Sequence, residues 1–331
     1  MNLENNYINQ LKFISIILIS IYTISYIGYE IQAFDKVAYV TTRLVSNLAF
    51  PLLLMVFGVL VLNKHEGLFS TVKKTYKLLI PSFVFWNIIL AILILIFIGV
   101  DKFPTKITTS AWFAWILISN VLVIPILNEF IKREKERGLE YILCLFVISS
   151  ILWSLSVQFN FSMYFIDLVF FTEPLCFMVL GYYLANKQFK CNSNKVFFYS
   201  LIVFIVTLAI RIYLLANGFN EWDSYFIPLF NDALIKINVD PFTIIAVSSL
   251  FLMFKTGFGR YLSNSKIISF YSGIIFSSIL LISIFGLILT VFPFTDNWII
   301  LTVVGTIVFL ISNGIISFIL SKIPVLKKVI V

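Results

Sequence analysis

Charge, cysteine and histidine are scarce in this chain. Asp, Glu, Lys and Arg together make up 12% of its 331 residues, and it holds three cysteines and one histidine. Hydrophobic residues make up 60%, and the mean hydropathy is +1.02. This composition excludes a soluble globular protein. The three cysteines fall within or beside hydrophobic runs, so we expect no disulfide, and we also expect no metal site.

Ten hydrophobic runs divide the chain. Most are close to the ~20 residues that an α-helix needs to cross a bilayer, while the eighth is short and must borrow flanking residues. The runs are residues 9–28, 41–62, 78–100, 111–130, 141–157, 163–184, 197–216, 241–254, 267–291 and 298–320. We therefore predict an all-α, polytopic integral membrane protein with about ten transmembrane helices. Residues 1–331 are expected to form a single membrane-embedded domain with no separate soluble domain, because the connections are short.

Lysine and arginine fall on alternate connections between these runs. The N-terminus, the connections after even-numbered runs and the C-terminus hold 18 of them, the other connections hold five, and Arg211 lies inside a run. Basic residues are retained on the cytoplasmic side during insertion, so both termini are predicted to be cytoplasmic, with the chain in the cell (plasma or inner) membrane. The net charge of +8 is dispersed, which favours contact with membrane lipids, and no nucleic acid partner is expected.

Three ionisable residues lie inside predicted spans, where a charge is costly and needs a partner. Asp167 and Arg211 lie at matched depths near the outer ends of consecutive runs, which predicts a structural ion pair. Glu173 lies deeper, directly before Pro174, and proline bends a helix. A carboxylate beside such a bend is a functional candidate. The alternative is a glutamate that is hydrogen-bonded to a neighbouring polar side chain.

Lys73, Lys74 and Lys77 cluster where the third span begins, and their spacing puts them on one helical face. Cations at a helix N-terminus oppose the macrodipole, so an anion is expected there, either lipid phosphate or a phosphate-bearing cofactor. Lys12 and Thr23 are eleven residues apart, which is three turns plus about 20°, so they share one face of the first span. The outer half of that span is rich in Ser and Tyr and is expected to face protein or a cavity instead of lipid.

Several stretches, in chain order, match patterns of one membrane family. Residues 50–86 (FPLLLMVFGVLVLNKHEGLFSTVKKTYKLLIPSFVFW) resemble its second span, basic loop and proline-containing third-span entry. Further stretches that resemble family segments are 112–125 (WFAWILISNVLVIP), 177–184 (FMVLGYYL), 268–278 (ISFYSGIIFSS) and 320–330 (LSKIPVLKKVI). Together they resemble the membrane acyltransferase family called acyltransferase 3, whose members transfer acyl groups to sugars or lipids.

The chain departs from that family at several positions. The first-span Arg and His of the family correspond here to Lys12 and Thr23, and the ninth-span His corresponds to Ser278. The one histidine, His65, lies in a predicted cytoplasmic connection. Abstracting a proton from a hydroxyl acceptor needs a positioned base, worth roughly 10²–10⁴-fold in rate. Glu173 or Asp167 could take this role if burial raises its pKa.

The resemblance implies an enzyme, a membrane O-acyltransferase. It would transfer an acyl group, most simply acetyl from cytoplasmic acetyl-CoA, to a hydroxyl of a cell-surface polysaccharide or its lipid-linked precursor. The implied catalytic residues are Glu173, Thr23 and Ser278, and the implied acyl-CoA-binding residues are Lys12, Lys73, Lys74, Lys77 and Trp112. One alternative is a non-catalytic relative that serves polysaccharide export or assembly. A second, an ion-coupled transporter, lacks counterparts of its charged residues in an inverted second half.

Overall fold

The computed structural model describes residues 3–30, 42, 44–62, 68–97, 103–159, 174–216, 225–226, 236–237, 240–258, 266–291 and 297–323. Nearly all of this part is helical. The helices are α1 (Leu3–Glu30), α3 (Ala49–Val61), α4 (Leu68–Phe97), α5 (Phe103–Phe159), α6 (Pro174–Asn186), α7 (Ser193–Ala216), α8 (Pro241–Met253), the π-helical turn η2 (Phe254–Phe258), α10 (Lys266–Gly273), α11 (Ile275–Val291) and α12 (Trp298–Ser321). Two short strands, β1 (Tyr225–Phe226) and β2 (Lys236–Ile237), pair antiparallel.

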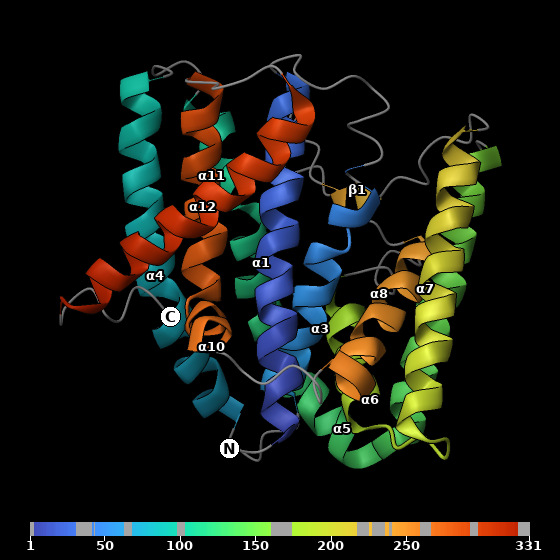
Figure 1. Cartoon of the computed structure of the whole chain (residues 1–331). Coiled ribbons are helices and arrows are strands. Elements are labelled where there is room, and N and C mark those ends of the chain that lie inside the picture. Colours follow the sequence, from blue (N-terminus) through green and yellow to red (C-terminus); the bar gives the residue numbers. More distant parts are fainter. Residues whose placement is uncertain are drawn as a thin grey trace.

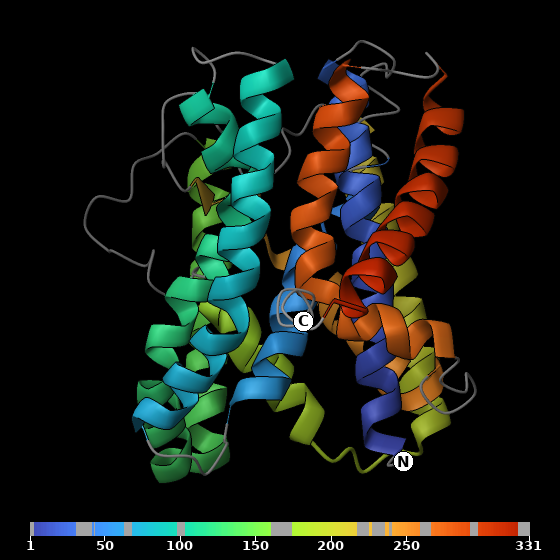
Figure 2. The same cartoon turned by 90° about the vertical axis from the view of Figure 1, so that its left-hand side faces the viewer.

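Helix α3 forms the centre of the bundle. Ten of its thirteen residues are buried, and it packs against α1, α6 and α8. Helix α4 packs against α5 and α11, and α11 packs in turn against α1 and α12. In the view of Figure 2, α4 and α5 stand on one side and α1, α11 and α12 on the other. Helix α3 is therefore shielded from lipid by its neighbours.

Two glycines bring α3 and α6 into backbone contact. A Cβ atom added to Gly58 would lie 2.0 Å from the Met178 carbonyl oxygen, and one added to Gly181 would lie 2.2 Å from the Met55 carbonyl oxygen. Small residues allow such close approach, and van der Waals packing of this kind holds membrane helices together. We call this contact the α3–α6 seam. Both glycines belong to the sequence stretches singled out above.

Two outer helices expose branched apolar residues on one stripe each. On α4 the stripe recurs every fourth residue, and the same spacing recurs along α12. The exposed residues are Ile80, Val84, Ile88, Ile92 and Ile96 on α4, and Ile299, Val303, Ile307, Ile311, Ile315 and Ile319 on α12. Exposed apolar stripes of this kind are suited to contact with acyl chains, as predicted for an integral membrane protein.

Helix α5 breaks at Lys135. Its backbone has φ 53° and ψ −137°, and it is the one non-glycine residue of the described part with positive φ. That region is adopted almost only by glycine and costs about 1–3 kcal/mol for other residues. The two halves of α5 meet here, at the end of the bundle where α1 begins (Figures 1 and 2). The segment 131–140, between the fourth and fifth hydrophobic runs, thus contains a break between two helices.

The predicted fold class is confirmed: the chain is an all-helical membrane protein. Six helices of the described residues are long and apolar enough to cross a bilayer, and seven if α10 and α11, bent by 73°, count as one span. The short eighth run does borrow residues, since η2 extends it to Pro241–Phe258. The count of ten crossings and the cytoplasmic termini stay predictions from the sequence.

Candidate functional site

Helix α1 carries a polar face into the interior. Ser15, Ser20 and Ser25 are fully buried, and each donates its hydroxyl to a carbonyl three or four residues earlier. This confirms that the polar outer half of the first span faces protein. Since α1 packs against α3, α10, α11 and α12, its polar face lies at the meeting point of four segments.

Lys12 and Thr23 lie at two different levels along the axis of α1. Lys12 is half-buried within a predicted span, and it forms no hydrogen bond or ion pair with any residue that the structure describes. Thr23 faces α11, because a Cβ added to Gly286 would lie 3.2 Å from its methyl group. The Phe13 and Tyr271 rings are 5.5 Å apart, so the chain direction from Tyr271 to Gly286 follows that of α1 from Phe13 to Thr23. An ammonium without a partner at membrane depth calls for an anion.

Ser278 belongs to a buried polar cluster that joins α11 and α12. Its hydroxyl donates to the Ile274 carbonyl at 2.8 Å and accepts from Asn313 Nδ2 at 2.8 Å. The hydroxyl of Ser317 donates to Asn313 Oδ1 at 3.4 Å, and all three polar side chains are at least 98% buried. We call these three residues the α11–α12 cluster.

The cluster lies between the two levels of α1. Ser278 is eight residues before Gly286, which is roughly 12 Å along a helix, on the side toward Tyr271. Its level is therefore between that of Thr23 and that of Lys12. The structure thus places these three predicted residues along one side of the bundle interior.

The other predicted site residues are placed less fully. Lys73 and Lys77 are exposed on the first turns of α4, and the side chain of Lys74 lies outside the described part, as does that of Trp112 on α5. Asp167 and Glu173 lie outside the described residues altogether. Whether these side chains join Lys12 and Thr23 stays a prediction.

Arg211 has a carboxylate partner near the outer end of the bundle. Its guanidinium lies 3.7 Å from Asp240, and it also donates to the Leu44 carbonyl at 3.4 Å. Asp240 is the N-cap of α8 and accepts from the Thr243 amide at 2.9 Å. The predicted pair with Asp167 lies outside the described residues, but the guanidinium is already engaged by Asp240. Arg211 and Asp240 thus join α7 to α8, and Arg211 also contacts the segment that precedes α3.

Sequence reasoning missed Asp240, Asn313 and Ser317. Asp240 carried a usable signal, since Asp before Pro241 is typical of a helix N-cap followed by proline at the first helical position. Asn313 and Ser317 are four residues apart, so they share a face of α12, and Asn is uncommon within a span. Both signals were present without an alignment.

Together, the buried central helix, the lipid-facing stripes and the polar interior define a multi-pass helical membrane protein. The model of an acyltransferase domain matches residues 5–322, and the chain belongs to the acyltransferase 3 family. Neither a search of curated proteins nor a search of solved structures returns a match. The family confirms the predicted resemblance and makes the chain a membrane acyltransferase by class.

Proposed function

We propose that the chain is an O-acyltransferase of the cell (plasma or inner) membrane. It takes an acyl group, most simply acetyl, from cytoplasmic acyl-CoA and passes it to a hydroxyl of a cell-surface polysaccharide or its lipid-linked precursor. The observation that supports this most is the half-buried ammonium of Lys12 without a partner among the described residues, on the polar face of α1. In an acyltransferase domain, an anionic donor is the ligand that this arrangement suits.

The donor is proposed to enter from the end of the bundle where α1 begins. Lys12, Lys73, Lys74 and Lys77 would contact its phosphates, and Trp112 would lie beside it. Lysine retains the charge needed for a phosphate contact although it lacks the bidentate geometry of arginine. The exposure of Lys73 and Lys77 leaves both ammonium groups available to a soluble ligand.

The transfer itself is proposed to occur between the levels of Lys12 and Thr23. The acceptor hydroxyl attacks the thioester carbonyl, its proton passes to a base, and the CoA thiol leaves with a proton. Glu173 is the proposed base, with Asp167 as its alternative. Ser278 already donates one hydrogen bond and accepts another, so its role is to line and position the site beside Thr23 instead of taking the proton.

One observation favours a second candidate function. Thr23 and Ser278 stand where the family has histidines, and Ser278 is engaged in joining α11 to α12. A relative that has lost its base would serve polysaccharide export or assembly without catalysis. The two candidates differ in what a deletion removes.

Deleting the gene and analysing the surface polysaccharide by NMR separates the two candidates. We expect O-acyl signals to disappear while the glycan is still made and exported. Complementation with the parent gene should restore them, and complementation with a Lys12→Ala variant should not. Loss of the polysaccharide itself would support the non-catalytic candidate, and unchanged O-acylation would contradict the proposed enzyme.

The donor site has its own test. Each charge-assisted phosphate contact is worth about 1.5–3 kcal/mol, so Lys77→Ala should weaken acyl-CoA binding about tenfold or more. The purified, detergent-solubilised protein can be titrated with acetyl-CoA by calorimetry, with Lys195→Ala as a control at an exposed lysine on α7. If a triple Lys73, Lys74 and Lys77 alanine variant binds as the parent does, these lysines serve only membrane topology.

A further inference from the structure

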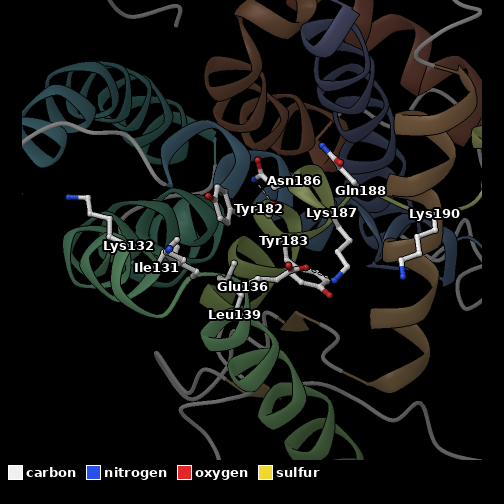
Figure 3. Close-up of a pocket in the computed structure, with 11 residues that line it drawn as sticks. Ile131, Lys132, Glu136, Leu139, Tyr182, Tyr183, Asn186, Lys187, Gln188 and Lys190 are labelled. Carbon is white, nitrogen blue, oxygen red and sulfur yellow. Dashed lines mark hydrogen bonds and ion pairs between the residues drawn. The ribbon is translucent and has the colours of Figure 1, made fainter.

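A pocket of about 690 Å³ lies between α5 and the C-terminal end of α6, at the end of the bundle predicted to be cytoplasmic (Figure 3). Its volume falls within the ~300–1,000 Å³ typical of small-molecule sites. Eleven residues line it, of which four are lysines and one is a glutamate, so the lining carries a formal charge of +3. None of the residues assigned above to acyl transfer lines this pocket. We call it the α5–α6 pocket.

One wall is fixed by an ion-pair network across the two helices. Lys187 pairs with Glu136 and, at 3.2 Å, with Glu140, and the Tyr183 hydroxyl donates to Glu140 at 2.9 Å. The hydrogen bond to Glu136, followed by the interactions with Tyr183 and Glu140, raises the pKa of Lys187, so its ammonium stays charged at neutral pH. Figure 3 shows Glu136, Tyr183 and Lys187 drawn together on this wall. Lys187 is therefore engaged within the protein.

Lys255 also stabilises this wall of the pocket, through hydrogen bonds to its backbone. From the π-helical turn η2 its ammonium donates to the Leu184 carbonyl at 2.8 Å and to the Lys187 carbonyl at 2.9 Å. These carbonyls end α6, where a cation is favoured by the helix dipole. The wall is thus anchored on both sides before any ligand binds, so the pocket is largely preformed.

Two lysines of the lining have no partner among the residues that the structure describes. Lys132 pairs with Glu129 at 2.6 Å and points away from Lys187 in Figure 3. Lys135 and Lys190 form no hydrogen bond or ion pair within the part of the chain that the structure describes. Lys135 is also the residue with the strained backbone, and strain of this kind is concentrated at functional sites. The strain and the uncompensated charge coincide at one pocket.

We propose that the α5–α6 pocket is a phosphate-binding site, held by Lys135 and Lys190. Lysine binds phosphate as a compact point charge, although it lacks the planar fork with which arginine binds phosphate and carboxylate. The two arginines of the same segment, Arg133 and Arg137, do not line the pocket. Asn186 and Gln188 add amide groups beside the lysines. Two kinds of ligand would bring a phosphate group to this site: the nucleotide end of a CoA ester and the headgroup of an anionic phospholipid.

A matched pair of double variants tests the proposal. Lys135→Gly with Lys190→Ala removes both free charges, and glycine accepts the Lys135 backbone conformation without strain. Arg133→Ala with Lys195→Ala removes two charges at the same end, outside the pocket. Each protein, purified in detergent, is titrated with CoA and with 3′-dephospho-CoA. Each is also examined by native mass spectrometry with phosphatidylglycerol and with phosphatidylcholine. These measurements detect binding directly and need no acyl transfer, so their outcome is independent of the proposed enzymatic function.

We expect the pocket variant to lose about 100-fold in affinity for one probe, since each charge-assisted contact is worth about tenfold. The control variant should stay within about threefold of the parent. Weaker binding of 3′-dephospho-CoA than of CoA would assign the pocket to the nucleotide. Selective loss of phosphatidylglycerol adducts would assign it to a lipid headgroup. The proposal is overturned if both double variants bind every probe alike, or if the parent binds none of them.

Discussion

Replacing the seam glycines with alanine tests what holds the centre of the bundle. Cβ contacts shorter than 3.0 Å are essentially never found, whereas an added Cβ at Gly58 would lie 2.0 Å from the Met178 carbonyl oxygen. The variant must therefore move the two backbones apart by about 1 Å, the difference between these distances. At Gly181 the corresponding distance is 2.2 Å, so the required shift is nearly as large.

Neither helix can yield by itself, because ten of thirteen residues are buried in α3 and ten of thirteen in α6. A gap of 0.5–1 Å forfeits about a quarter to a half of the dispersion attraction across it. Insertion of a methyl group into a packed core typically costs about 1–3 kcal/mol after relaxation. Because backbone atoms lie on both sides of the contact, we expect the upper end of this range. Each single variant should lose about 3 kcal/mol of folding stability. The double variant should cost less than the sum, because one separation makes room for both methyl groups.

Thermal unfolding of the detergent-purified protein, followed by tryptophan fluorescence, measures the effect. Each seam variant should lower the midpoint by roughly 5 °C. Gly273→Ala is the matched control, because nothing lies within 4 Å of its added Cβ, and its midpoint should not fall. A Gly58→Ala midpoint equal to that of the control, or fully additive losses in the double variant, would refute the reasoning.

Three further predictions concern other parts of the chain. Arg211→Met should destabilise by about 3 kcal/mol because it leaves the buried Asp240 carboxylate unpaired, and Asp240→Asn should recover part of the loss in a double-mutant cycle. Asn313→Leu should cost about 1 kcal/mol by leaving Ser278 without its donor, and adding Ser278→Ala should recover most of this stability in thermal unfolding. Reporter fusions in the connection 131–140 should report the cytoplasm, and an external location would invert the predicted topology.

The membrane fold was predictable because its signals are local. Each hydrophobic run coincides with a helix over the residues that the structure describes, and the serine-rich half of α1 is buried as its composition indicated. The two glycines of the seam could be identified from the sequence, since Gly58 and Gly181 both lie within motifs. That they oppose each other was not predictable, because 123 residues separate them and the pairing depends on how the bundle assembles.

The polar contacts were harder to predict, because partners are chosen in three dimensions. Matched depth predicted Asp167 as the partner of Arg211, whereas the partner that the structure describes is Asp240, across the α7–α8 connection. A depth inferred from the sequence does not distinguish two carboxylates that are both expected near the same end of the bundle. The break at Lys135 left no sequence signal at all, since a lysine gives no sign of positive φ. The α5–α6 pocket depends on that break and was therefore also missed.

The seam has a consequence for how the chain is made. Its two halves leave the ribosome 123 residues apart, with the α4–α5 pair between them in sequence. At about 5–20 residues per second, α3 waits roughly 6–25 s before α6 exists. During that interval α3 faces lipid, or the insertion machinery, with its glycine backbone uncovered. The core of this bundle is therefore closed late, when α6 packs against α3.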